Sequence, residues 1–260
     1  MMIYILGELM KVKFISFLFM LLVTLFTACG NPSADEIVNE AIVSSGWNKF
    51  KNNDIEFDFR GIHYKVFHNN GRFIYEKIYV DTTQGIIREG MTNDSTYKEL
   101  NGLEILLEEA QINKIRSSIN QVVYFNLLPY KLNDAAVNKK FAGESFINGK
   151  EYYKVKVTFD EEGGGDDYND WFIYWFEKNT KEMDYFAYYY HTNGGSSRFR
   201  AVKKQHIVNG FTFYDWENFT SDEIGEEIEN YDKLFIEGKL EKVSDIELRN
   251  IEVEEVKSRL

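Results

Sequence analysis

Cysteine, proline and positive charge are scarce in this 260-residue chain. The single cysteine, Cys29, excludes an intramolecular disulfide. The chain has only 2 prolines and no long stretch rich in Pro, Gly or Ser of the kind that links domains, so we predict one domain. The chain has 30 Lys and Arg residues and 42 Asp and Glu residues, and the resulting net charge of −12 would repel a phosphate backbone. We therefore expect no nucleic-acid partner.

Aromatic residues, by contrast, are abundant, and 4 Trp, 17 Tyr and 21 Phe make up 16% of the chain. This content argues against disorder and for an extensive apolar interior. Many Val, Ile and Thr residues accompany the aromatic ones, and this mixture favours β-structure.

The N-terminal segment has the pattern of an export signal. Lys11 and Lys13 precede an apolar run over residues 14–26, which only Ser16 and Thr24 interrupt. A helix of this length reaches about 20 Å, short of the roughly 30 Å of a bilayer core, which favours a cleaved signal over a permanent span. We predict a signal peptide over residues 1–28, with Met10 as a candidate true start.

The residues that follow, Phe26-Thr27-Ala28-Cys29, resemble a bacterial lipobox. The resemblance implies that Cys29 receives a diacylglyceryl group and becomes the new N-terminus, with residues 29–33 as a lipidated tether. Acyl chains contribute about 0.8 kcal/mol per buried CH2, enough to anchor a protein to a membrane. We therefore expect an exported protein held at the cell envelope, at the outer membrane. The alternative is a buried cysteine at the end of an uncleaved helix.

Two helices are expected in the mature chain. Ser33 and Glu36 have the spacing of a capping box, and the apolar stripe behind them predicts a helix over residues 35–45, ended by Gly46. A second helix is predicted over residues 104–127, because its apolar residues recur at helical spacing until Pro129.

Strands dominate the remainder. From Asp54 onward apolar and polar residues alternate, Gly61 shifts the phase as a bulge would, and five Asn-Gly pairs favour type I′ hairpin turns. We predict an α+β, mostly antiparallel fold whose eleven strands are too many for a flat one-sided sheet. The predicted strands cover residues 54–67, 72–80, 85–91, 96–100, 140–147, 151–160, 171–177, 183–191, 197–208, 211–219 and 239–248. Residues 245–260 are expected to run from an edge strand into a solvated tail.

Two of these strands, 171–176 and 185–190, carry aromatic residues on both faces. Both faces must therefore be sheltered from water. One interpretation is a central hairpin between a helix and loops; the other is a hollow on one face that a guest molecule fills, since aromatic concave surfaces bury apolar ligands well.

Several short motifs resemble an uncharacterised family of Bacteroidota lipoproteins with no established activity. They are Val123-Tyr124-Phe125, Leu128 to Asp134, Val155 to Phe159, Gly163 to Asp167, Tyr174-Trp175 and Arg198-Phe199-Arg200. The match runs from about residue 35 to residue 219. Such proteins resemble the LolA/LolB lipoprotein carriers, whose fold is a curved antiparallel half-barrel with helices across its concave face. The resemblance implies a single half-barrel domain over residues 34–260, with about eleven strands, anchored by lipid as LolB-type acceptors are.

Candidate site residues come from the aromatic strands and from two arginines. Arg198 and Arg200 lie two apart on one strand, so they could either brace Asp167 or Asp170 or bind an anionic head group. The candidate ligand-binding residues are Phe57, Phe59, Tyr64, Trp171, Ile173, Trp175, Phe186, Tyr188, Tyr190, Arg198 and Arg200.

The acidic loop 160–170 offers hard oxygen ligands on a glycine-rich backbone, which suits calcium, but the spacing is not that of an EF-hand and we favour a solvated hairpin loop. Its candidate metal ligands are Asp166, Asp167 and Asp170. The four histidines show no His-Glu-x-x-His spacing and have no cysteine beside them, which argues against zinc.

These patterns predict a non-enzymatic, membrane-anchored lipoprotein that binds a lipid or another apolar ligand in the concavity of its half-barrel. The sequence assigns no catalytic residue and no cofactor. Two alternatives stay open: a structural or interaction lipoprotein of the cell envelope with a filled core, and a divalent-metal-dependent enzyme that uses the loop 160–170. The sequence does not determine the oligomeric state.

Overall fold

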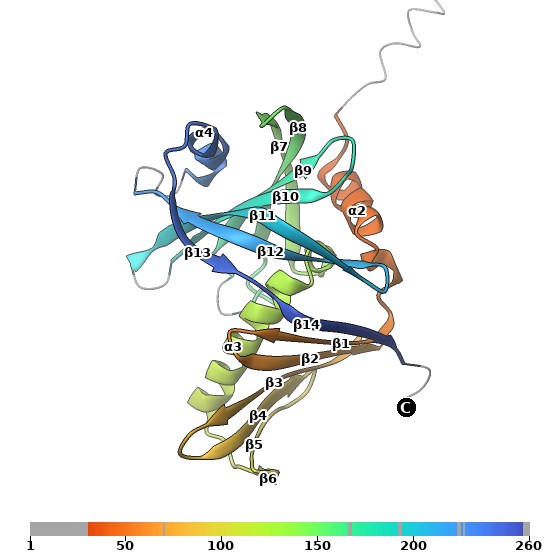
Figure 1. The fold of residues 1–260 in the computed structure, drawn as a ribbon, viewed down its shortest axis with the longest axis vertical. Helices are drawn as coiled ribbons and strands as arrows, with labels where there is room; N and C mark the ends of the chain where they lie inside the picture. Colours follow the sequence, from red (N-terminus) through yellow and green to blue (C-terminus); the bar gives the residue numbers. More distant parts are fainter. Residues whose placement is uncertain are drawn as a thin grey trace, which may run out of the picture. The chain divides into compact units, whose positions relative to one another are not determined.

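Fourteen strands, paired antiparallel throughout, form two seven-stranded sheets in the computed structural model (Figure 1). The structure describes residues 31–69, 71–165, 168–191, 194–222, 225 and 227–256, and residues 34–260 form one compact unit. The expected signal peptide and Cys29 lie outside the described residues. The predicted α+β, mostly antiparallel class is confirmed.

The first sheet has the strand order β14-β1-β2-β3-β4-β5-β6 and the second the order β13-β12-β11-β10-β9-β8-β7. The strands of the first sheet are β1 (Asn52–Phe59), β2 (Ile62–Asn69), β3 (Arg72–Asp81), β4 (Gly85–Thr92), β5 (Thr96–Leu100), β6 (Leu103–Glu104) and β14 (Arg249–Glu255). Those of the second are β7 (Val137–Ile147), β8 (Lys150–Phe159), β9 (Trp171–Glu177), β10 (Met183–Tyr190), β11 (Ser196–Val208), β12 (Phe211–Thr220) and β13 (Glu241–Ile246).

Asn-Gly turns join several neighbouring strands. Asn101, Asn148 and Asn209 each have a φ near +50°, and the glycine after each has a φ above +80°. Two successive residues with positive φ are what a type I′ turn requires, so the predicted hairpins are confirmed at these three positions. Asn70 and Asn193, in the other two pairs, lie outside the described residues.

The prediction of eleven strands in one curved sheet was wrong. The expected strand 54–67 is the β1–β2 hairpin, because Arg60 (φ 52°) and Gly61 (φ 77°) form a two-residue turn instead of a bulge. Two further strands are not among the predicted eleven. One is β6, which pairs with β5, and the other is β14, which pairs with β1, with Val253 opposite Ile55. The edge strand expected within residues 245–260 is confirmed by β14, which lies at the edge of the first sheet, whereas residues 257–260 of the expected tail lie outside the described residues.

Three α-helices are described: α2 (Ala34–Ser44), α3 (Glu109–Asn126) and α4 (Tyr231–Ile236). The helix predicted over 35–45 agrees with α2 to within one residue at each end. The second helix starts later than predicted, because β6 uses Leu103 and Glu104, and a capping box of Glu108 with Gln111 begins α3. Within the described part of the chain, no helix combines the length and apolar character needed to cross a bilayer.

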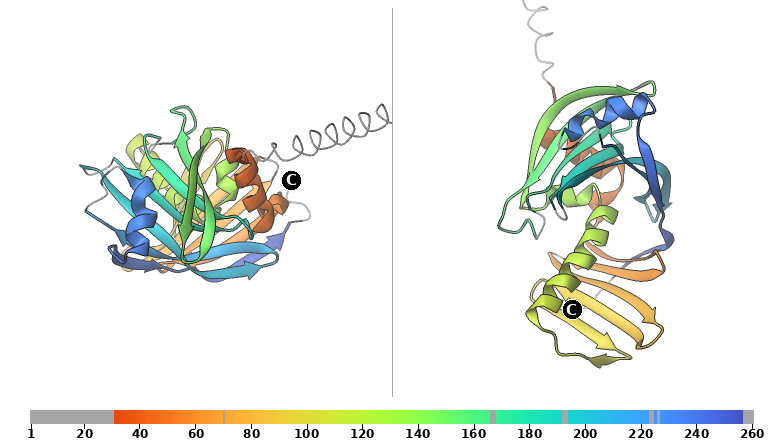
Figure 2. Two further views of the ribbon diagram at one scale, coloured as in Figure 1. Left: turned by 90° about the horizontal axis from the view of Figure 1, so that it is seen from above. Right: turned by 90° about the vertical axis from the view of Figure 1, so that its left-hand side faces the viewer.

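Both faces of the second sheet are covered, as the two-sided aromatic strands predicted. On one face α2 and α3 bury the main core, which includes Phe172, Tyr174 and Phe176 of β9. On the other face α4 and the 3₁₀ turn η4 (Ile228–Asn230) bury a second cluster around Ile173 and Trp175. Figures 1 and 2 show α3 extending from the first sheet to the second.

Candidate functional site

A cavity of about 520 Å³ lies between the second half of α3 and the inner face of the second sheet, by which we mean the face that α3 covers. The turn between β1 and β2 contributes Phe59 and Arg60 to its rim. The other lining residues are Asn120, Gln121, Val122, Tyr124, Phe125, Asn126, Phe159, Gly164, Asp170, Phe172, Tyr188, Tyr190, Arg198, Arg200, Trp216, Asn218 and Ile246.

Strand register explains why these side chains meet. Phe172, Tyr188 and Arg198 are direct neighbours across β9, β10 and β11. Because side chains alternate between the two faces of a strand, residues opposite one another across paired strands share a face. A second row, two residues further along, consists of Tyr174, Phe186, Arg200 and Asn218.

The wall formed by α3 is aromatic. The Phe125 ring stacks on Phe186 at 5.5 Å between centroids, and it also contacts Phe172 and Tyr188. Beside it, the hydroxyl oxygens of Tyr124 and Tyr174 lie 3.5 Å apart. Burial raises the pKa of both tyrosine hydroxyls, so these groups are neutral at physiological pH. These two hydroxyls therefore add no charge to this wall.

Two arginines of β11 supply the positive charge. Arg200 Nη2 donates to the Tyr188 hydroxyl at 3.2 Å, and its guanidinium carbon lies 4.5 Å from the Phe125 ring centroid and 5.2 Å from that of Phe186. Arg198 Nη1 donates to the Ser197 carbonyl at 2.7 Å and to the Ser196 hydroxyl at 2.9 Å. Aromatic faces attract a cation, so the rings hold Arg200 against the wall.

The bracing of Asp170 by an arginine was expected and is not found among the described residues. Asp170 lines the cavity, but its Oδ1 accepts a hydrogen bond from the backbone N–H of His191 at 3.2 Å. Asp166 and Asp167, the other candidate metal ligands, lie outside the described residues. In the described part of the chain, no group of three or more His, Cys, Asp or Glu side chains is placed to hold a metal ion.

The eleven candidate ligand-binding residues fall into three groups. Those that line the cavity are Phe59, Tyr188, Tyr190, Arg198 and Arg200. Those buried in the main core are Phe57, Tyr64 and Phe186. Those on the opposite face of the second sheet, toward the second cluster, are Trp171, Ile173 and Trp175. The last group faces away from the cavity because the even-numbered residues of β9, and not the odd-numbered ones, are paired with Tyr188 and Phe186.

Several lining residues were not singled out from the sequence. Phe125 follows Tyr124 in the predicted helix and belongs to one of the family motifs. Helical periodicity does not tell which sheet the Phe125 side of the helix packs against. Trp216 and Asn218 alternate along β12, a signal that could have placed them on one face. Asn120 and Tyr124 also line a second cavity of about 290 Å³ on the other flank of α3, beside the Lys131–Asp134 ion pair.

A comparison with solved structures gives several similar chains. The chain is similar to a DUF1329 family protein from Desulfovibrio piger, with a TM-score of 0.48, 10% sequence identity and coverage of 84% of this chain and 92% of the other. It is also similar to a LolA superfamily protein from Nitrosomonas europaea, with a TM-score of 0.47, 9% identity and coverage of 86% and 92%. No curated protein sequence matches the chain.

The sequence itself places the chain in a family. Residues 11–248, which include α2, α3 and every strand that lines the cavity, match one family model. The chain belongs to the family of unknown function DUF6503.

Proposed function

We propose that this protein is a non-enzymatic binding protein that holds an apolar ligand, such as a lipid acyl chain, between α3 and the second sheet. The observation that carries the proposal is the cavity of about 520 Å³ with aromatic side chains on both walls. Small-molecule sites have volumes of about 300–1,000 Å³ and mostly apolar linings with a few polar groups. A structural lipoprotein with a filled core would leave room for no more than a few waters, so the cavity favours binding.

The expected driving force is burial of apolar surface. Each methylene group removed from water contributes about 0.8 kcal/mol, so eight buried methylenes would contribute about 6 kcal/mol before the cost of association. The rings of Phe125, Phe172 and Tyr188 supply contact area for such a chain. The rings already pack against one another, so little ordering is needed on binding.

The proposal includes the location of the protein. We propose that acylated Cys29 anchors the mature chain in the membrane at the cell envelope, at the outer membrane, where the ligand would be a lipid or lipid-derived molecule. The membrane is then a partner through the anchor, and nucleic acid is not a partner, since the chain has a net charge of −12.

Native mass spectrometry of the gently solubilised full-length protein tests the proposal. We expect a copurifying lipid with the wild type and its loss in Val122→Trp, because Val122 lines the cavity from α3 and a larger side chain fills the space. The matched control is Lys114→Trp, at an exposed position of the same helix, which should keep the lipid. Wild-type protein that is empty in repeated preparations, and that takes up no added lipid, would overturn the proposal.

A further inference from the structure

Two of the arginines that line the cavity, Arg198 and Arg200, form no ion pair with a carboxylate in the described part of the chain. Within the described residues, neither Arg198 nor Arg200 has an Asp or Glu oxygen within ion-pair distance. Arg198 hydrogen-bonds only to neutral oxygens, of Ser196, Ser197 and Thr220. Arg200 donates to a neutral phenol, that of Tyr188. Among the residues that the structure describes, two positive charges, two residues apart on one strand, thus have no ion-pair partner in a partly buried aromatic site.

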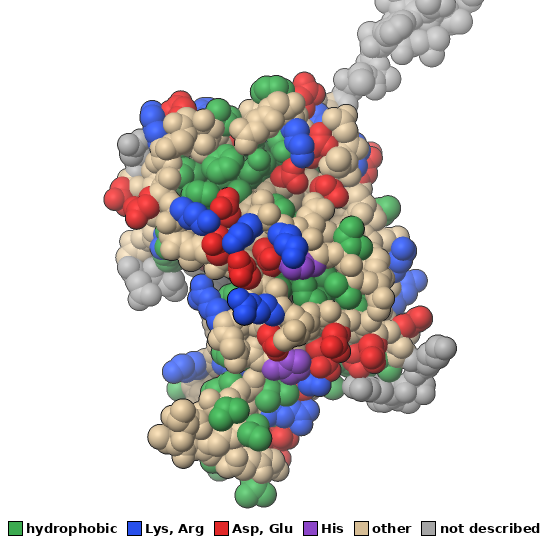
Figure 3. All heavy atoms as spheres, viewed as in Figure 1, with side chains coloured by type: hydrophobic (Ala, Val, Ile, Leu, Met, Phe, Trp, Pro, Cys, Tyr) green, Lys and Arg blue, Asp and Glu red, His purple; other side chains and the backbone are tan. Residues whose placement is uncertain are grey.

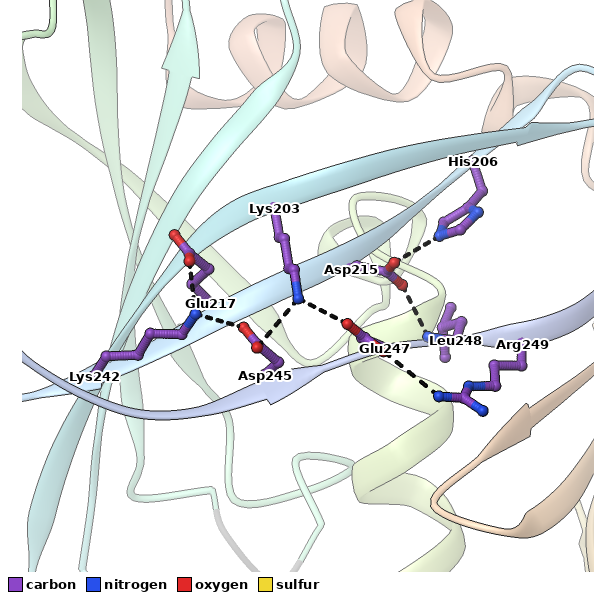
Figure 4. A network of polar contacts seen from close by, with 9 residues as sticks. All are labelled: Lys203, His206, Asp215, Glu217, Lys242, Asp245, Glu247, Leu248 and Arg249. Atoms are coloured by element: carbon purple, nitrogen blue, oxygen red, sulfur yellow. Dashed lines mark hydrogen bonds and ion pairs between the residues drawn. The ribbon is translucent and has the colours of Figure 1, made fainter.

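The outer face of the same strand shows the opposite arrangement. Lys203 of β11 pairs with Asp245 at 3.1 Å and with Glu247 at 2.7 Å (Figure 4). Next to it, Lys242 contacts both Glu217 and Asp245. Figure 3 shows acidic and basic side chains side by side on this face. Among the described residues, the basic side chains Lys203 and Lys242 on the outer face are thus paired with carboxylates, whereas Arg198 and Arg200 on the inner face form no such ion pair, although Asp170 lines the same cavity.

Arg200 also has an unused hydrogen-bond donor. Its Nε is buried and has no hydrogen-bond partner. Across the β11–β12 pairing, Asn218 lies directly opposite Arg200 and lines the same cavity, and its buried Oδ1 is unpartnered as well. Leaving a buried polar group without a partner is unfavourable. The Arg200 Nε–H is a donor, so it favours a ligand group that accepts hydrogen bonds, whereas Asn218 Oδ1 is an acceptor and would need a donor.

From this geometry we infer that the ligand carries an acidic head group on a single apolar chain, namely a long-chain carboxylate. The inference rests on the proposed binding function and names the class of ligand. A carboxylate accepts two parallel hydrogen bonds from a planar guanidinium group, and the Arg200 Nε–H is a donor that no described residue uses. Arg198, on the neighbouring row, adds a second positive charge to the head-group site.

The volume of the cavity suits a ligand with one apolar chain. At about 520 Å³ it lies within the range of small-molecule sites, about 300–1,000 Å³. The aromatic rings of Phe125, Phe172 and Tyr188 would contact the chain next to the head group.

The test compares two probes that differ only in the head group. Delipidated full-length protein is titrated with hexadecanoate and with hexadecanol, and the two dissociation constants are measured by calorimetry or by displacement of a fluorescent acyl probe. The wild type should bind hexadecanoate at least about tenfold more tightly than hexadecanol. In Arg200→Gln that preference should fall to about twofold or less, while binding of hexadecanol stays within about threefold of the wild type.

Two further variants separate charge at the site from charge in general. Lys204→Gln removes a positive charge from an exposed position on the same strand and should keep the full preference. Arg200→Lys keeps the charge but loses the Nε–H fork, so it should retain part of the preference even if Arg200→Gln folds poorly. Melting curves of all variants establish that the compared proteins are folded.

The outcomes distinguish the two proposals. Equal binding of both probes by the wild type would overturn the acidic head group and leave the binding function standing. An unchanged preference in folded Arg200→Gln and Arg200→Lys would overturn the role of Arg200. Binding of neither probe, by a protein that is also empty as purified, would overturn both the binding function and this inference.

Discussion

At the scale of single residues, Glu89 is a buried carboxylate that connects the first sheet to α3. Its side chain is 7% exposed, and its oxygens lie 2.9 Å from Lys77 Nζ and 3.0 Å from Lys98 Nζ. Lys77 also donates to the Ser118 hydroxyl of α3 at 2.7 Å. Burial alone would raise the pKa of Glu89, but hydrogen bonds from the two lysines outweigh burial and hold the pKa below its ordinary value of 4.5.

A lowered pKa makes part of the stability dependent on pH. This contribution is complete above the ordinary carboxyl pKa and is lost as the pH falls through the lowered one. We expect Glu89→Gln to reduce the free energy of unfolding by about 3 kcal/mol at neutral pH, because two partly buried lysines lose their counter-charge. The difference between variant and wild type should shrink as the pH falls through the lowered pKa of Glu89, because the wild-type carboxylate is then protonated as well.

Urea unfolding at pH 7, 5 and 3 measures this difference. Glu104→Gln, which removes a carboxylate from an exposed position in β6, should follow the wild type at each pH. If the Glu89→Gln deficit were the same at every pH, its origin would be packing and not the charge pairs.

At the scale of elements, α4 is a six-residue helix that shelters one face of the second sheet. Asp232 connects this helix to the sheet. Its Oδ2 accepts a hydrogen bond from Ser145 Oγ at 2.6 Å and one from Trp175 Nε1 at 3.3 Å, and Lys154 Nζ lies 3.6 Å from the same oxygen. These contacts reach β7, β8 and β9 from one carboxylate that is 3% exposed. An element this short has little intrinsic helical stability, so tertiary contacts hold it in place.

Asp232→Ala should therefore detach α4. We expect the free energy of unfolding to fall by about 3 kcal/mol, because the Trp175 indole N–H and the Lys154 ammonium group lose a buried partner. The control is Lys233→Ala on the same helix, whose contact with Asn230 is exposed, and it should change the free energy of unfolding by less than about 0.5 kcal/mol. Equal losses in both variants would show that Asp232 does not fasten the helix.

The elements differ in how far the sequence determined them. α2 and the Asn-Gly hairpins carry their own signals, a capping residue with an apolar stripe and residues that tolerate positive φ. The β1–β2 turn was misjudged because Arg60 gives no such signal and the alternation resumes directly after Gly61. α4 was missed because its apolar face is defined only by contact with distant residues such as Phe199 and Trp175.

The cavity was predictable only in part, for a related reason. Alternation along a strand tells which of its residues share a face. It does not tell which residues of the neighbouring strand lie on that same face of the sheet. Tyr188 and Arg198 were assigned to one site and do lie side by side, since β10 and β11 pair at these positions. Trp175 lies on the opposite face, because it pairs with Tyr185, and the side chains of Tyr185 and Tyr188 point to opposite faces of β10. Sheet register is a property of the whole fold, which no single strand encodes.

At the scale of the whole described domain, β13 and β14 carry the chain from the second sheet to the first. The crossing occurs at Glu247 and Leu248, between Ile246 and Arg249. Asp215 of β12 secures it: its Oδ1 accepts a hydrogen bond from the Leu248 N–H at 2.8 Å, and its Oδ2 shares one with His206 at 2.8 Å (Figure 4). This one side chain therefore fixes the point at which two sheets that face the same helix are joined.

We expect Asp215→Ala to weaken that junction. A buried backbone N–H and the His206 ring would lose their acceptor, which should lower the free energy of unfolding by about 2 kcal/mol. Because β14 pairs with β1 directly after the crossing, amide exchange should quicken in both strands before it quickens in β9 and β10.

Glu217→Ala supplies the comparison, since Glu217 is another carboxylate on β12 whose ion pair with Lys242 is more exposed. Surface pairs of this kind contribute little, so its unfolding and exchange should stay close to those of the wild type. If Asp215→Ala exchanged at β14 no faster than Glu217→Ala, the junction would be held by strand pairing alone. In that case the pairing of β14 with β1, which includes Ile55 with Val253, would suffice to keep the two sheets around α3 and its cavity.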